Sequence, residues 1–149
     1  MLDFEQLAFI EKWRQKASRG IVVVLDGTLG DIIVTLRVGE GPGRMDLRGQ
    51  DATGAVRKQR LSIGDRVTMA IEYSAKDVQP VASAMRPGAV IAPGTTVSGT
   101  VRESGEVAVV DCGALVLVRG DTLPGVSEGD AVSFTIASEG KAYLIPTRG

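Results

Sequence analysis

The residue types on which most nucleophilic and metal chemistry depends are scarce in this chain. It has no histidine and one cysteine, Cys112, among 149 residues. Without histidine there is no serine–histidine or cysteine–histidine nucleophile pair, and one cysteine forms neither an internal disulfide nor a thiolate zinc site. The phosphate-loop pattern also fails, because Ala142 follows Gly140-Lys141 where serine or threonine is needed. We therefore predict no catalytic residue, no metal site, no small-molecule cofactor and no enzymatic activity.

A basic segment is the clearest candidate for binding chemistry. Basic side chains neutralise phosphate groups, so a cluster of them indicates a contact with nucleic acid. The formal net charge of −1 and the pI of about 5.5 argue against a protein that binds nucleic acid in bulk. The other interpretation is a solvated rim joined to the interspersed acidic residues by ion pairs. The cluster consists of Arg44, Arg48, Arg57, Lys58 and Arg60.

The N-terminal segment has the pattern of an amphipathic helix. Asp3 and Gln6 form a capping-box pattern, and the spacing of the apolar residues predicts a helix from Phe4 to Ser18 that Gly20 ends. Its apolar surface exceeds one narrow stripe, so it either caps the first barrel or docks on a partner protein. The candidate partner-binding residues are Phe4, Leu7, Phe9, Ile10 and Trp13.

Beyond Gly20 the hydrophobic pattern becomes that of short strands. Residues 21–25 and 32–38 are β-branched runs, and residues 67–73 alternate between apolar and polar types. The strand pattern resumes after a stretch with two Pro-Gly dipeptides. This pattern predicts an all-β protein with further strands near residues 97–101, 107–111, 114–118, 132–136 and 141–146.

An internal repeat divides the chain. Residues 61–71 align with residues 126–136, and in both copies a Gly-Asp pair forms a turn before an alternating strand. The repeat predicts two tandem small barrels of five strands each. The predicted ranges are 1–20 for the N-terminal helix, 21–85 for the first barrel, 86–94 for a linker and 95–149 for the second barrel.

The second half resembles a known class of barrel. Residues 97–101, followed by further strands and by residues 129–136, resemble small Greek-key barrels of the OB-fold type. The Gly-Asp-x-Val-x-Phe segment that begins at Gly129 is similar to that of cold-shock-type barrels, and SH3-like barrels use the same turn chemistry. The resemblance implies two OB-like or SH3-like barrels, and we transfer no functional residue from it.

These features predict a non-catalytic binding or assembly protein. A β-barrel scaffold would make protein–protein contacts in a larger complex, as a structural or virion-type component, with a protein partner or self-association. The alternative is an OB-fold protein that binds nucleic acid through the basic segment. No apolar stretch is long enough for a membrane span, and Asp3, Glu5 and Glu11 interrupt any signal-peptide core. We therefore expect a cytoplasmic protein, or one assembled into a particle in the cytoplasm.

Overall fold

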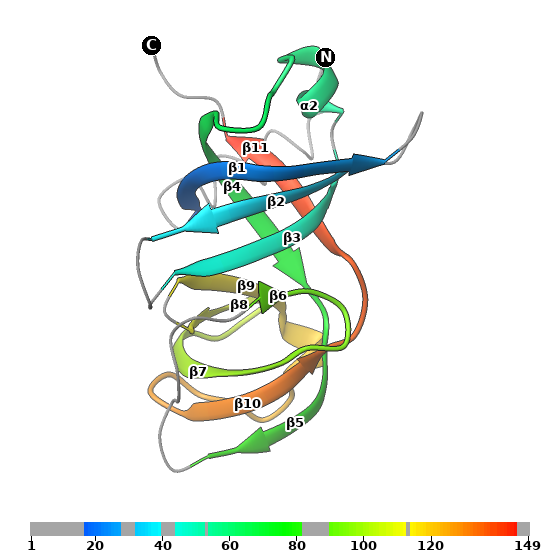
Figure 1. The fold of residues 1–149 in the computed structure, drawn as a ribbon. Helices are drawn as coiled ribbons and strands as arrows, with labels where there is room; N and C mark the ends of the chain where they lie inside the picture. The colour runs from blue at the N-terminus through cyan, green and yellow to red at the C-terminus, as the bar shows by residue number, and fades with distance from the viewer. Residues whose placement is uncertain are drawn as a thin grey trace.

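The structure is a computed structural model that describes residues 17–27, 32–39, 44–52, 54–81, 90–112 and 114–145. These residues form an all-β protein, with one single-turn α-helix and one 3-10 turn (Figure 1). The elements are β1 (Ser18–Gly27), β2 (Ile32–Val38), β3 (Met45–Asp51), α2 (Ala55–Lys58), β4 (Arg66–Tyr73), β5 (Ala75–Pro80), β6 (Val90–Ile91), β7 (Thr96–Glu103), β8 (Val107–Asp111), β9 (Leu115–Arg119), η3 (Gly120–Thr122), β10 (Ala131–Ile136) and β11 (Gly140–Ile145).

Five strands close into a barrel. Antiparallel pairing joins β1 to β2 and β2 to β3, and β3 pairs in parallel with β11. Strand β11 pairs with β4, and β4 pairs with β1. The last pairing returns to the first strand, so the ring has no free edge. The order β1-β2-β3-β11-β4 uses a strand from the C-terminal end of the chain to complete the barrel.

The remaining long strands lie below this barrel in Figure 1 and are connected to it by β4. After Ser74 the chain continues from β4 into β5, which pairs with β10. Strand β10 pairs with β7, β7 with β8, and β8 with β9. Strand β9 then returns to the end of β4 through parallel pairing of Glu72 with Leu117 and of Tyr73 with Val118. Strand pairing therefore crosses the boundary expected from the repeat.

The repeated Gly-Asp turn is built in the same way in both copies. In the first copy the Ser62 N–H donates to the Asp65 carboxylate at 2.8 Å. The Gly64 N–H donates to the carbonyl of Val22 in β1 at 2.7 Å. The turn therefore fixes where β1 lies relative to the start of β4.

In the second copy the Ser127 N–H donates to the Asp130 carboxylate at 2.9 Å. The Gly129 N–H donates to the carbonyl of Val101 in β7 at 2.8 Å. Val101 therefore occupies the position of Val22, and β7 and β10 correspond to β1 and β4. This correspondence lets positions on the two halves be compared residue by residue.

One hydrophobic core runs through both sets of strands. The largest buried side chains include Leu36 and Met45 among β1–β4, and Phe134 in β10, all at most 1% exposed. They belong to one contiguous cluster. The N–H of Ala114 donates to the Met45 sulfur at 3.1 Å, which links the two sets inside that core. Because the core is shared, we expect the strands to stabilise one another.

Two sequence predictions differ from the fold, and a third lies mostly outside the described residues. Most of the predicted N-terminal helix, up to residue 16, lies outside the described residues. Ser18, Arg19 and Gly20 are not helical but begin β1, because they pair with β4. Within the predicted linker, Val90 and Ile91 form β6 and pair with β3. Among the residues that the structure describes, the helical segments lack the length and the apolar character of a membrane span.

Candidate functional site

The outer face of the closed barrel carries a cross-strand row of side chains. Ile21 of β1 lies opposite Arg37 of β2 and also opposite Arg66 of β4. Directly opposite residues of antiparallel strands project to the same face, so Ile21 lies between two arginines. Two residues earlier on β1, Arg19 lies opposite Thr68 and shares that face. The register thus gathers three arginines and a threonine.

Gly20 sets how closely β1 and β2 approach beside this row. A Cβ atom at Gly20 would clash with the carbonyl oxygen of Arg37 and would lie 2.9 Å from the Leu36 side chain. A larger residue would therefore push β1 away from β2. Because Gly20 alternates with Arg19 and Ile21, this Cβ would point toward the core side of the sheet, and Gly20 lines the outer surface with its backbone.

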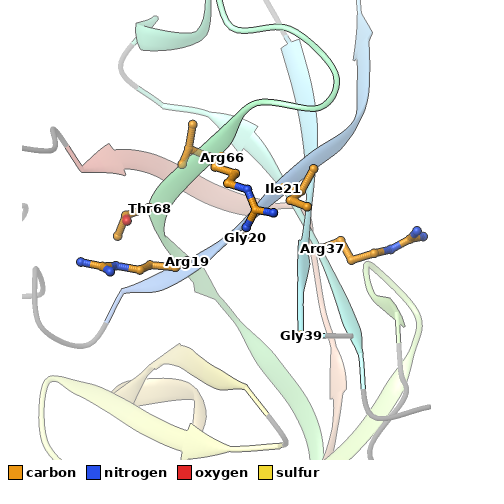
Figure 2. A pocket seen from close by; sticks show the side chains of 8 residues that line it. Arg19, Gly20, Ile21, Arg37, Gly39, Arg66 and Thr68 are labelled. Atoms are coloured by element: carbon orange, nitrogen blue, oxygen red, sulfur yellow. The ribbon is translucent and has the colours of Figure 1, made fainter. Parts of the chain in front are cut away.

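An open pocket of about 470 Å³ lies over this row. Figure 2 shows the Arg66 side chain extending across β1 toward Gly20 and Ile21, while Arg19 and Arg37 extend to opposite sides. The guanidinium groups are spread apart, so those of Arg19 and Arg66 would converge on a shared ligand only by rotating these exposed side chains. The lining residues are Arg19, Gly20, Ile21, Arg37, Gly39, Arg66, Val67 and Thr68; we call this site the arginine pocket.

Arg37 is held by an acidic partner. Its Nε lies 2.9 Å from Asp46 Oδ1, and its Nη2 donates to Asp46 Oδ2 at 3.0 Å. This bidentate hydrogen bond is the main reason why the pKa of Asp46 falls below its ordinary value. The same interaction raises the pKa of Arg37. Arg37 therefore forms a fixed wall of the pocket, with its charge largely balanced.

Arg19 and Arg66 differ from Arg37 in their charge balance. Both are exposed, and none of the ion pairs among the residues that the structure describes involves either of them. They lie diagonally across the β1–β4 ladder, a spacing of about 7 to 8 Å that long side chains can bridge. If the two side chains rotated toward each other, their like charges would repel. An anion between them would remove that repulsion.

A second cavity, of about 400 Å³, has the opposite charge. It is lined by Glu72, Glu106, Val107, Arg119 and Asp121, and Arg119 pairs with Asp121 at 2.9 Å. Burial raises the pKa of Glu72, with smaller increases from the neighbouring Glu106 and Asp121. In the described part of the chain, no three acidic, cysteine or histidine side chains are grouped to hold a metal ion.

Cys112 is buried, as its apolar surroundings in the sequence predict. Burial raises the pKa of its thiol to about 12, with a smaller contribution from Asp111. The thiol is therefore protonated at neutral pH, and the thiolate needed for nucleophilic attack is not formed.

The predicted basic cluster does not assemble around one point. Arg44 is exposed just before β3, and Arg48 in the middle of β3 pairs with Glu139 at 2.9 Å. The other members lie in or after α2, beyond the far end of β3. The seven residues of β3 span roughly 20 Å, so Arg44 is far from the α2 group.

The members near α2 share one small region. Lys58 ends α2 and Arg60 follows it, and both are exposed. Arg57 lies in α2, but its side chain is outside the described residues, as are all five predicted partner-binding residues. The structure therefore leaves the nucleic-acid and partner assignments as predictions.

Sequence reasoning missed the arginine pocket for a specific reason. The predicted helical range 1–20 includes Arg19. Arg37 and Arg66 are separated from each other by almost thirty positions in the chain. Only the β1–β2 and β1–β4 registers bring the three together. The available signal was the alternation in which Arg37 and Thr68 fall on the polar side of their strands.

Comparison with known proteins gives little similarity. No protein-family model matches the chain, and no curated protein matches it. Among solved structures, one match is the cytoplasmic molybdate-binding protein ModG, crystallised with molybdate bound. The two are 17% identical, the match covers 87% of this chain and 95% of that chain, and the TM-score is 0.49.

This match corrects two predictions made from the sequence. We predicted an assembly scaffold with protein partners and no small-molecule cofactor. The matched structure is described as a molybdate-binding protein. We therefore do not carry forward the scaffold function or the predicted absence of a small-molecule cofactor. The expectation of an all-β, OB-like barrel is retained in its coarse form.

Proposed function

We propose that this protein binds a small oxyanion in the arginine pocket and catalyses no reaction. The observation that supports this proposal is the pair Arg19 and Arg66. Both are exposed cations on neighbouring strands, and neither has an acidic partner among the described residues. Thr68 adds a hydroxyl group that can donate a hydrogen bond on the same face.

The chemistry of these side chains suits an oxyanion. A guanidinium presents parallel N–H groups that match two oxygens of a phosphate-like ion. Hydrogen bonds to charged groups contribute about 1.5 to 3 kcal/mol each. The pocket is open and the arginines must rotate, so part of this gain is lost in ordering them. We expect dissociation constants of about 0.1 to 1 mM, or roughly −4 to −5.5 kcal/mol.

We also propose a finer description of the fold as two OB-like barrels that exchange their last strands. The first barrel takes β11 as its fifth strand. The second has the corresponding order β7-β8-β9-β5-β10, with β5 and the end of β4 as its fifth strand. The parallel pairing of β3 with β11 corresponds to that of β9 with β4, which supports this description. The arginine pocket lies on the first barrel alone.

The second barrel provides substitutions that suit the test. Counted from the shared turn, Ser98 occupies the position of Arg19 and Ala131 the position of Arg66. The variant Arg19→Ser/Arg66→Ala therefore introduces residue types that the same fold already has at these places. A control, Lys76→Ser/Arg102→Ala, removes two exposed positive charges from β5 and β7.

Isothermal titration calorimetry at about 20 mM ionic strength, where screening is weak, is the test. The probes are phosphate, sulfate and molybdate, each a tetrahedral oxyanion. We expect the pocket variant to bind at least tenfold more weakly than the original chain, and the control to bind within about twofold. Equal weakening in both variants would instead indicate an effect of overall charge and would contradict the proposed site.

Single-stranded oligonucleotides form a separate arm of the same titration. Binding of an oligonucleotide, without binding of the three small anions, would contradict the proposed function. It would favour the basic segment near β3 and α2. Substitution of Lys58 and Arg60 would then test the role of that segment.

A further inference from the structure

The arginine pocket is larger than an inorganic oxyanion requires. Its volume is about 470 Å³. A water molecule takes about 30 Å³ in the liquid, so a tetrahedral oxyanion needs on the order of 100 Å³. Pockets for organic ligands measure about 300 to 1,000 Å³. After an oxyanion is bound, most of this pocket remains for a second chemical group.

The rest of the lining indicates the nature of that group. Ile21 lies in the middle of the row, between Arg37 and Arg66, and presents an apolar side chain to the pocket. Val67 also lines the pocket, but it alternates with Arg66 and Thr68 and its side chain packs against the core, so the apolar surface is that of Ile21. An inorganic oxyanion cannot use this apolar surface, because burying an apolar group against an ion gives no favourable contact. An organic substituent can cover it.

The charge of the pocket favours one class of anion. Two arginines, Arg19 and Arg66, have no acidic partner in the described structure, while Arg37 is balanced by Asp46. A phosphomonoester carries about −1.5 to −2 charges near neutral pH, which matches two cations. A carboxylate has a single charge and would leave one arginine without a counter-ion.

From these observations we infer that the arginine pocket is a phosphomonoester site, with the phosphate on Arg19 and Arg66 and the organic group against Ile21. This inference rests on the proposed function and makes it more specific. Because the pocket is open, the far end of the organic group stays in water. Only the part next to the phosphate is recognised.

The internal repeat again supplies the decisive variant. Thr100 occupies the position of Ile21 in the second barrel, opposite Ala131. Ile21→Thr keeps a β-branched residue in β1 but replaces apolar surface by a hydroxyl. The probes are phenyl phosphate, inorganic phosphate, benzoate and phenol, titrated by calorimetry into the full chain and into two variants, Ile21→Thr and Arg19→Ser/Arg66→Ala.

We expect phenyl phosphate to bind about tenfold more tightly than inorganic phosphate, which corresponds to covering on the order of 50 Å² of apolar surface. Ile21→Thr should reduce this preference, measured as the ratio of the two dissociation constants in the same variant, to less than about threefold. The double arginine variant should lose both ligands. Benzoate and phenol should bind more weakly than phenyl phosphate by at least tenfold.

The outcomes separate this inference from the proposed function. If inorganic phosphate binds as tightly as phenyl phosphate, the phosphomonoester inference is overturned while the oxyanion site stands. A preference for phenyl phosphate that survives Ile21→Thr also overturns the inference, because the organic group then contacts another surface. If no phosphate compound binds, both proposals fail.

Discussion

Arg19 and Arg66 illustrate how position, rather than residue type, creates a candidate site. Arginines are abundant on protein surfaces, and Arg37, Arg102 and Arg119 each have an acidic partner at 2.9 to 3.1 Å. Arg19 and Arg66 lie diagonally on paired strands, and the described residues supply no acidic partner for either. This difference is why we propose them as anion ligands.

At the same scale, Glu72 predicts a pH-dependent stability. Burial raises its pKa, so the folded protein binds that proton more tightly than the unfolded chain does. Its contribution is fully present below the ordinary glutamate pKa and is lost as the pH rises through the raised value. Arg119 and Lys141 oppose this shift, while Glu106 and Asp121 strengthen it.

Glu72→Gln removes the titration and should therefore stabilise the protein at pH 7. Glu72 is only half-buried, so we expect a gain below about 1 kcal/mol. Urea denaturation at pH 7 and pH 4 measures it, and the gain should shrink toward zero at pH 4, where glutamate is largely protonated in both states. A destabilised variant at pH 7 would mean that the charged carboxylate is needed by Arg119 or Lys141.

At the scale of elements, the repeated turn explains why the sequence aligns with itself. Gly64 and Gly129 have φ angles of +99° and +89°, a conformation that side chains rarely adopt. A Cβ atom at either glycine would meet nothing within 4 Å. The requirement for glycine is therefore conformational and not a matter of space.

Gly64→Ala and Gly129→Ala should each cost about 1 to 3 kcal/mol of stability. Because both turns have the same hydrogen bonds, the two costs should be similar, and chemical denaturation of each variant measures them. Ile63→Ala serves as the control in the same turn, because the Ile63 side chain is 65% exposed. A loss below about 0.3 kcal/mol for either glycine variant would show that the turn tolerates a side chain.

The strands also show which parts of the fold the hydrophobic pattern of the sequence could predict. Alternation placed residues 67–73 and 132–136 close to the observed β4 and β10, because one face of each is buried. The pattern could not assign β11 to the first barrel, since parallel pairing with β3 leaves no local signal. It also extended the predicted helix into Ser18–Gly20, where pairing with β4 overrides local preference.

At the scale of the whole molecule, the shared strands and core predict one unfolding transition. Phe134 is fully buried in β10 and belongs to the same hydrophobic cluster as Leu36 and Leu47 of the first barrel. Strand β4 pairs with β1 and β11 in that barrel and with β9 at its end. Loss of either set of strands would therefore expose surface on the other.

Phe134→Leu should lower the global stability by roughly 1 to 2 kcal/mol. Native-state hydrogen exchange should show faster exchange in β2 and β3 as well as in β7 and β10, with similar free energies of opening. Faster exchange confined to β5, β7, β8, β9 and β10 would contradict this prediction. It would mean that the two sets of strands unfold separately.

Nitrogen–proton NMR spectra of arginine Nε groups test the arginine pocket most directly. Phenyl phosphate is titrated into the labelled chain, and each arginine resonance is assigned by substitution. We predict saturable shifts of the Arg19 and Arg66 Nε–H signals and of the Ile21 and Thr68 amides. The signals of Arg102 and Arg119 should stay in place. Shifts that leave Arg19 and Arg66 unaffected, or that spread evenly over all arginines, would contradict the site.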